Sequence, residues 1–158
     1  MLLVKTRVAP SPIHGLGLFA EEFILAGSVV WKFTEGFDQT FTREQIEKLP
    51  EPAHFFLAKY AYLSTKTGRY LLDTDNGRYF NHSKIPNTST KTVAGEKEDI
   101  ICADKDIESG EEITVNYADQ EADHIDGNIL ESFYSKYTLV DEVDPRLKKS
   151  FNVDHQTS

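Results

Sequence analysis

The apolar residues of this chain occur in short runs separated by glycine and proline turns, and this spacing limits the folds open to it. Short runs rich in β-branched and aromatic side chains predict strands rather than long helices. Pro10 is expected to end the first strand, and Ser109-Gly110 to form the turn before the last. The expected strands are residues 2–8, 28–33, 70–72, 99–103 and 112–117.

Three segments favour helix instead. Thr42, followed three residues later by Gln45, predicts a capping box at the start of a short helix. The apolar side chains of residues 53–61 recur with the period of an amphipathic helix. Residues 129–137 repeat that period near the end of the chain. The whole pattern predicts a mainly β domain with helical inserts.

Composition narrows the function. The 158 residues fit one compact domain. The 26 acidic residues outnumber the 17 basic ones, for a net charge of −9, which argues against nucleic-acid binding and fits either a basic partner or simple solubility. No apolar run is long enough to span a membrane, and the start of the chain does not resemble a signal peptide. We therefore expect a cytoplasmic, reducing compartment, with a nuclear location or secretion into a host left open, and no membrane partner.

Common enzyme signatures are absent from the sequence. The five histidines lack metal-ligand spacing, and no GxSxG motif occurs. The lone Cys102 rules out an intramolecular disulfide and a zinc site built from several thiolates, so we expect a buried strand thiol and no metal. Gly15-Leu16-Gly17 is too short for a dinucleotide-binding fingerprint.

Three segments, taken in order, point to a family. They read HGLGLFA (14–20), NGRYFNHSKIPN (76–87) and SGEEITVNY (109–117). Their order and spacing resemble the SET-domain protein lysine methyltransferases, and the resemblance covers about residues 5–119. It implies small β-sheets around a C-terminal pseudoknot, in which the segment holding Asn81-His82 and the C-terminal segment thread through one another. It also implies S-adenosylmethionine (S-adenosyl-L-methionine) as methyl donor and a lysine of a basic protein or peptide as acceptor.

The resemblance also suggests a division of the chain and roles for single residues. Residues 1–119 would form the SET-like catalytic domain, with an insert at about 34–70, and residues 120–158 a post-SET-like helical segment and polar tail without zinc. Tyr117 takes the family's catalytic tyrosine position, although a structural tyrosine at a strand end is the other interpretation. The implied cofactor-binding residues are His14, Gly15, Leu16, Gly17, Arg78, Asn81 and His82, of which Arg78 could equally form a structural salt bridge. Candidate substrate-channel residues are Tyr62, Tyr70, Val115, Phe133 and Tyr134.

The chain departs from the family pattern in two places. Lys84 stands where many relatives have a cysteine after NHS, and the cysteine-rich, zinc-binding post-SET segment is missing. Residues 129–137 are the candidate substitute lid, or else a plain surface helix. The departures leave a second hypothesis open, a SET-like module that binds a peptide or cofactor without turnover. The sequence predicts neither the number of methyl groups added nor the oligomeric state.

Overall fold

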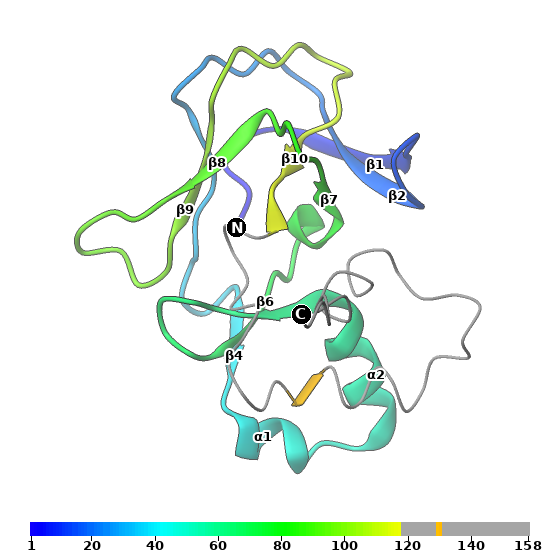
Figure 1. Cartoon of the computed structure of the whole chain (residues 1–158), viewed down its shortest axis with the longest axis vertical. Coiled ribbons are helices and arrows are strands. Elements are labelled where there is room, and N and C mark those ends of the chain that lie inside the picture. The colour runs from blue at the N-terminus through cyan, green and yellow to red at the C-terminus, as the bar shows by residue number, and fades with distance from the viewer. Residues whose placement is uncertain (118–128, 131–158) are drawn as a thin grey trace, which may run out of the picture.

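The computed structural model describes residues 1–117 and 129–130, which carry four small β-sheets, two α-helices and one 3₁₀ helix (Figure 1). The strands are β1 (Thr6–Pro10), β2 (Leu16–Ala20), β3 (Val29–Trp31), β4 (Gln39–Phe41), β5 (Ala61–Leu63), β6 (Tyr70–Leu72), β7 (Asn81–His82), β8 (Thr88–Lys91), β9 (Ile100–Ala103) and β10 (Thr114–Val115). The helices are α1 (Arg43–Glu47), α2 (Glu51–Tyr60) and the 3₁₀ helix η1 (Asn76–Tyr79). The predicted mainly β fold with helical inserts is confirmed.

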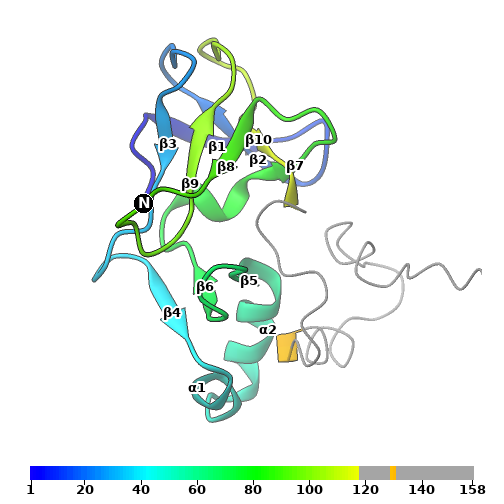
Figure 2. The same cartoon turned by 60° about the vertical axis from the view of Figure 1, so that its left-hand side comes forward.

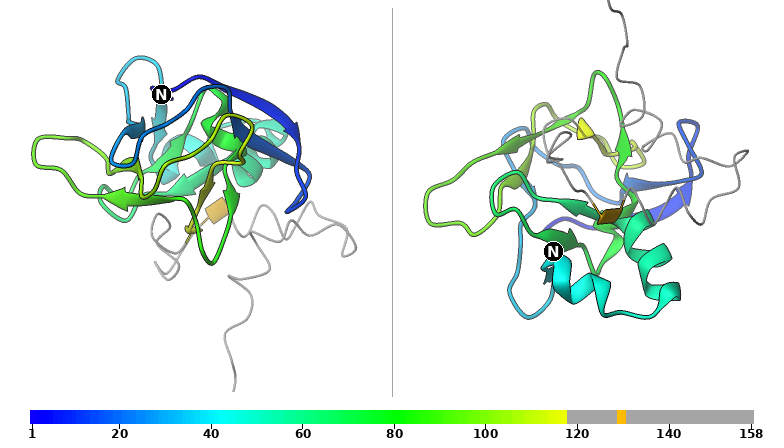
Figure 3. Two further views of the ribbon diagram at one scale, coloured as in Figure 1. Left: turned by 90° about the horizontal axis from the view of Figure 1, so that it is seen from above. Right: turned by 60° about the horizontal axis from the view of Figure 1, so that its bottom comes forward.

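The molecule has two halves (Figure 2). One half holds the β1-β2 hairpin, the β3-β9-β8 sheet and the β7-β10 pair. The other half holds the β4-β6-β5 sheet with α1 and α2, and Figure 3 brings these helices to the front in its right-hand view. Most of the segment predicted as an insert, residues 34–70, lies in this second half. No helix among the described residues is long and apolar enough to cross a membrane.

The first strand differs from its prediction. It begins at Thr6 and continues through Pro10, which pairs with Leu16 at the end of the hairpin. Proline lacks an N–H but is tolerated where a strand needs no further ladder hydrogen bond from that residue. The strand therefore ends at Pro10, as predicted, but the predicted bounds 2–8 were wrong, because a proline at the last position does not interrupt the ladder.

The capping box is confirmed. Thr42 Oγ1 accepts a hydrogen bond of 3.2 Å from the Gln45 backbone N–H, and the Gln45 side chain accepts one of 2.7 Å from the Thr42 N–H. Helix α2 spans Glu51–Tyr60, close to the predicted 53–61. The residue after the helix, Ala61, has an extended backbone and is the first residue of β5. The strands β2, β4, β5, β7 and β8 were not predicted. The β2 segment contains a glycine motif that favours a turn, and the other four strands have two to four residues each.

The β4-β6-β5 sheet lies between two hydrophobic cores and sends alternate side chains to each. Leu71 belongs to the first core, with Trp31, Leu18 and Ile113. Its sequence neighbours Tyr70 and Leu72 belong to the second core, with the α1 residue Ile46 and the α2 residue Leu57. Two residues beyond the main described range, Ile129 and Leu130, are also buried in the second core.

The strands β7 and β10 run parallel, with Thr114 opposite Asn81 and Val115 opposite His82. The Ser83 N–H continues the pairing to the Val115 carbonyl at 2.9 Å. The same C-terminal segment also meets the hairpin, because the Ile113 N–H donates to Leu18 O at 2.7 Å. Residues 112–115 therefore connect the first motif segment to the second.

Candidate active site

Tyr117 follows β10 after one intervening residue, Asn116, and lies beside His82 of β7. The two rings are 5.3 Å apart between centroids, and the Tyr117 backbone N–H donates to His82 Nδ1 at 3.3 Å. The Tyr117 hydroxyl donates to the Phe80 carbonyl at 2.7 Å. The parallel pairing of β7 and β10 thus brings the candidate catalytic tyrosine to the NHS motif.

Asn81 connects the NHS motif to the glycine turn. Its side-chain Nδ2 donates to the carbonyl oxygens of His14 and Leu16, each at 3.1 Å, and to Glu112 Oε1 at 2.8 Å. The residue is 4% exposed, so these contacts are shielded from water. The Asn81 amide nitrogen is therefore engaged within the protein. A cofactor contact of Asn81, as the resemblance implies, has to use its other polar atoms.

The two glycines of the turn have different environments. An added Cβ at Gly17 would overlap Glu112 Oε1 and lie 2.8 Å from Glu112 Cδ and 3.0 Å from Asn81 Nδ2. At Gly15 the same position has no heavy atom within 4 Å, but the φ angle of +48° is one that other residues rarely adopt. Gly17 is therefore required by packing inside the protein, whereas Gly15 is required by its backbone and borders open space.

A second asparagine clamps the end of the NHSKIPN motif. Asn87 Nδ2 donates to the Glu112 carbonyl at 2.8 Å, and Asn87 Oδ1 accepts from the Thr114 N–H at 2.9 Å. The hydroxyl of the neighbouring Thr88 donates to the Thr114 carbonyl at 2.7 Å. Because Asn87 and Thr88 are buried, these bonds fix the position of the strand that leads to Tyr117.

Arg78 lies in an aromatic cluster. Its guanidinium carbon is 5.7 Å from the centroid of the Tyr60 ring and 5.2 Å from that of Tyr79, and one N–H donates to the Thr74 carbonyl at 3.4 Å. Among residues 1–117 and 129–130, Arg78 makes no salt bridge with a carboxylate. The insert helix α2 thereby contacts the segment that precedes Asn81, through Tyr60.

A buried carboxyl lies under the same segment. Asp73 packs against Gly77 of η1, whose added Cβ would lie 2.9 Å from Asp73 Oδ2 and 3.2 Å from Trp31 Cδ1. Burial first, and the nearby Asp38 second, raise the pKa of Asp73 to about 8. Within the part of the chain that the structure describes, Asp73 Oδ1 has no hydrogen-bond partner. Asp73 therefore favours its neutral form at the base of the NHS segment.

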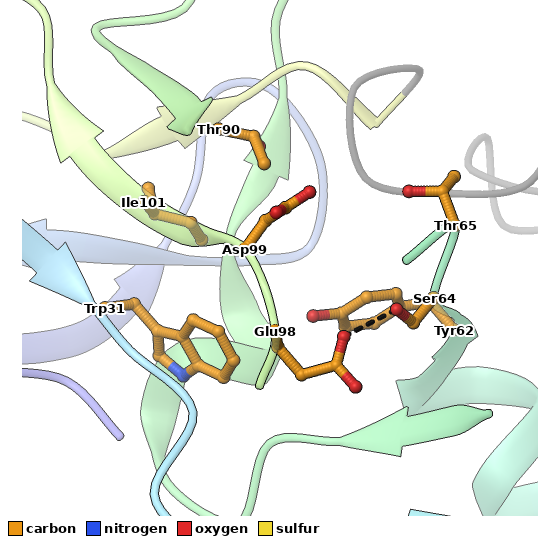
Figure 4. Close-up of a pocket in the computed structure, with 8 residues that line it drawn as sticks. All are labelled: Trp31, Tyr62, Ser64, Thr65, Thr90, Glu98, Asp99 and Ile101. Atoms are coloured by element: carbon orange, nitrogen blue, oxygen red, sulfur yellow. Dashed lines mark hydrogen bonds between the residues drawn. The ribbon is translucent and has the colours of Figure 1, made fainter. Parts of the chain in front are cut away.

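The candidate channel residues do not share one location. Tyr62 packs against the first core and lines a small pocket with Trp31, Glu98 and Asp99 (Figure 4). Tyr70 points to the other face of the sheet, and its hydroxyl accepts a hydrogen bond from the Ile129 N–H at 3.0 Å. Tyr62 and Tyr70 thus face opposite sides of the sheet, because Tyr62 pairs with Leu71, the neighbour of Tyr70, and side chains alternate along a strand.

Val115, the remaining described channel candidate, is 2% exposed and belongs to the first core. Phe133 and Tyr134 lie outside the described residues, as does most of the proposed lid at 129–137. Among the residues that the structure describes, no group of His, Cys, Asp and Glu side chains is arranged to hold a metal ion. Cys102 is buried in β9, as the sequence predicted.

The SET domain model matches residues 15–118, which is more than half of the chain and covers the first motif segment from Gly15 on and the other two in full. The chain belongs to the SET domain family. A histone-lysine N-methyltransferase of Mycosarcoma maydis, specific for lysine 4 of histone H3, is 31% identical over 119 residues, 72% of this chain. A histone-lysine N-methyltransferase of Arabidopsis thaliana is 35% identical over 118 residues, 70% of this chain. The chain spans 8% of the length of each.

Solved structures agree on the fold of this SET domain. A humanized mutant of the Polycomb Repressive Complex 2 of Chaetomium thermophilum, bound to an inhibitor, superposes with a TM-score of 0.56. The match is 24% identical and covers 75% of this chain and 15% of that one. A Plasmodium falciparum protein described as a candidate histone methyltransferase gives a TM-score of 0.52 at 23% identity, covering 73% of this chain and 95% of the other.

Two residues at the centre of this SET domain's site had no role assigned from the sequence. Glu112 accepts hydrogen bonds from Asn81 and from the Ser11 hydroxyl, whereas in the sequence it is only one residue of the third motif. Ser11 stands between two prolines, and the motifs predict no role for it. A serine hydroxyl often accepts a hydrogen bond from the backbone N–H two residues later and so marks a turn. This signal could have identified Ser11.

Proposed function

We propose that this SET domain transfers a methyl group from S-adenosylmethionine to the side-chain amine of a lysine in a protein substrate. One observation carries the proposal. Two segments far apart in the sequence converge on Asn81 and His82 of a third: the glycine turn through His14 and Leu16, and the C-terminal segment through Tyr117. These are the segments that carry the family resemblance, and the relatives are named histone-lysine methyltransferases.

The residues around the turn fit a cofactor of this kind. The open space beside Gly15 would allow a ligand to approach the backbone closely, where a side chain would intrude. We propose that the 14–17 turn, Arg78, Asn81 and His82 hold the cofactor. When bound, S-adenosylmethionine supplies an electrophilic methyl group on a sulfonium leaving group. The protein then has mainly to align the reactants and exclude water.

Tyr117 is the candidate for aligning the amine. Its hydroxyl hydrogen is directed to the Phe80 carbonyl, so the hydroxyl oxygen can act toward a substrate only as an acceptor. An acceptor at this point would orient the N–H groups of a neutral lysine amine. Burial of the amine beside the Tyr117 and His82 rings, next to the positive charge of a bound sulfonium, would disfavour the charged ammonium form and so lower the lysine pKa, which favours the nucleophile.

The charge of the chain supports a basic substrate. A net charge of −9 favours encounter with a lysine-rich protein. Histones are one such class, and the relatives' names include histone H3. The buried thiol of Cys102 is compatible with the reducing, intracellular compartment that such a substrate would share.

The test is incubation with isotopically labelled S-adenosylmethionine and a panel of basic proteins, including histones, followed by mass spectrometry. We expect label on lysine side chains, and none when the same proteins carry chemically blocked amines. We expect the same rate after exhaustive chelation, since one cysteine cannot build a thiolate zinc site. Cofactor binding by calorimetry without any methylated product would instead favour a binding module without turnover.

A further inference from the structure

We infer that Ser11 and Glu112 are positioning residues that set the shape of the 14–17 turn through Asn81. The inference rests on the proposed function in so far as this turn holds the cofactor. The carboxylate of Glu112 lies between the two motif segments. It accepts from Ser11 Oγ at 2.8 and 2.9 Å and from Asn81 Nδ2 at 2.8 Å.

Hydrogen bonds through Ser11 and through Asn81 link the two ends of the 14–17 turn to the Glu112 carboxylate. Ser11 Oγ accepts from the backbone N–H groups of Ile13 at 2.9 Å and His14 at 3.3 Å, so its own hydrogen is left for Glu112. The Ser11 N–H donates to the Gly15 carbonyl at 2.9 Å, which closes the loop. Asn81 holds the other end through the His14 and Leu16 carbonyls. Among the described residues, Glu112 is thus the one side chain that bonds to both Ser11 and Asn81.

The chemistry requires a carboxylate at this position. Both partners are donors, because Ser11 Oγ already accepts two N–H groups and Asn81 Nδ2 is an amide nitrogen. A carboxylate only accepts, whereas a carboxamide would place its own N–H₂ group against one of the two donors. Within the described residues no lysine, arginine or histidine nitrogen lies within 4 Å of Glu112, so the carboxylate is not there to balance a cation.

The site is also tightly packed. The Gly17 backbone lies so close to Glu112 that a Cβ would overlap its carboxylate. The position of the Glu112 side chain and the path of the turn are therefore coupled in both directions. Loss of either donor contact would let the turn relax away from the shape that we propose the cofactor uses.

The test is Glu112→Gln, with Glu108→Gln as the matched control, since Glu108 is an exposed acid on the preceding turn. Loss of a charge-assisted hydrogen bond should weaken S-adenosylmethionine binding by about tenfold or more in calorimetry. The KM for the cofactor should rise while kcat at saturating cofactor stays near the wild-type value. Ser11→Ala should also weaken S-adenosylmethionine binding. The loss of binding free energy in the double variant should be smaller than the sum of the losses in the two single variants.

Hydrogen exchange of the cofactor-free protein gives a readout that does not depend on binding. In Glu112→Gln, residues 11–17 should exchange faster, while β8 and β9 keep wild-type protection. Wild-type exchange in the turn would overturn the inference, as would faster exchange throughout both strands, which indicates general destabilisation. If the wild-type protein binds no S-adenosylmethionine, the proposed function fails, and the exchange experiment still decides whether Glu112 shapes the turn.

Discussion

The Tyr117 hydroxyl donates a hydrogen bond of 2.7 Å to the carbonyl of Phe80, the residue that precedes Asn81. This bond joins two segments 37 residues apart in the sequence. It also fixes the rotation of the hydroxyl hydrogen, so the orientation of the candidate catalytic group depends on the backbone of the NHS segment. The phenol is therefore pre-organised before any substrate arrives.

Tyr117→Phe keeps the ring and removes the hydroxyl. We expect kcat and kcat/KM to fall together, by a factor on the order of 100, because an orienting contact with the amine is lost. Cofactor affinity, measured by calorimetry, should change little. A Phe variant that methylates at the wild-type rate would assign Tyr117 a packing role only.

The two glycines of the turn should respond differently to alanine. Gly15→Ala meets no atoms but forces a left-handed backbone on alanine, at a cost of about 1–2 kcal/mol. Gly17→Ala displaces the Glu112 carboxylate and should lower both the melting temperature and the cofactor affinity more strongly. In a Glu112→Ala background the Gly17→Ala change should have a smaller effect. Equal effects in the two backgrounds would show that the overlap with Glu112 is not what excludes a side chain at Gly17.

Asn87→Ala should destabilise the fold. The change leaves the buried Thr114 N–H and the Glu112 carbonyl without their partners, and each unsatisfied group costs about 1–3 kcal/mol. For a chain of this size about 1 kcal/mol shifts the melting temperature by roughly 2–4 °C. Thermal unfolding measures this directly. Asn76→Ala, an asparagine in the 3₁₀ helix with no such contacts to β10, is the control, and a similar shift for both would argue against the clamp.

Asp73 should make stability depend on pH. Its pKa is about 8 in the folded protein, through burial first and the nearby Asp38 second, against an ordinary value of 3.8. Below about pH 4 the Asp73 carboxyl is protonated in both the folded and the unfolded protein. Between about pH 4 and pH 8 it is protonated only in the folded protein, so the free energy of unfolding falls as the pH rises across this window. Asp73→Asn is neutral throughout. The melting temperature of the variant relative to that of the wild type should therefore increase from pH 5 to pH 8. If the difference between the two melting temperatures stays constant over this range, the raised pKa is contradicted.

Local sequence signals were sufficient where one segment forms its structure alone. The Thr42–Gln45 capping box and the α2 periodicity depend on neighbours three or four residues away, and both appear as predicted. The three motifs indicated the family for a related reason, since their residue types and order can be read directly along the chain. The burial of Cys102 followed from its apolar run.

Other features required distant partners. The two-residue strands β7 and β10 have no pattern of their own, because each exists only through its pairing with the other. The sequence grouped Tyr62 with Tyr70, but sheet register sends one to each core. Nothing local distinguishes Asn81 as a donor to His14 and Leu16, 67 and 65 residues away.

The sequence by itself determined the family, the β-rich composition and the chemical types of the site residues, because these depend on residue identity and short-range spacing. Only the tertiary structure decided which of those residues meet. The role of the Glu112 carboxylate depends on two hydrogen-bond donors, Ser11 and Asn81, which lie 101 and 31 residues away in the sequence. A buried hydrogen bond depends on geometry within about 3 Å, and no pattern along the chain specifies that for residues so far apart.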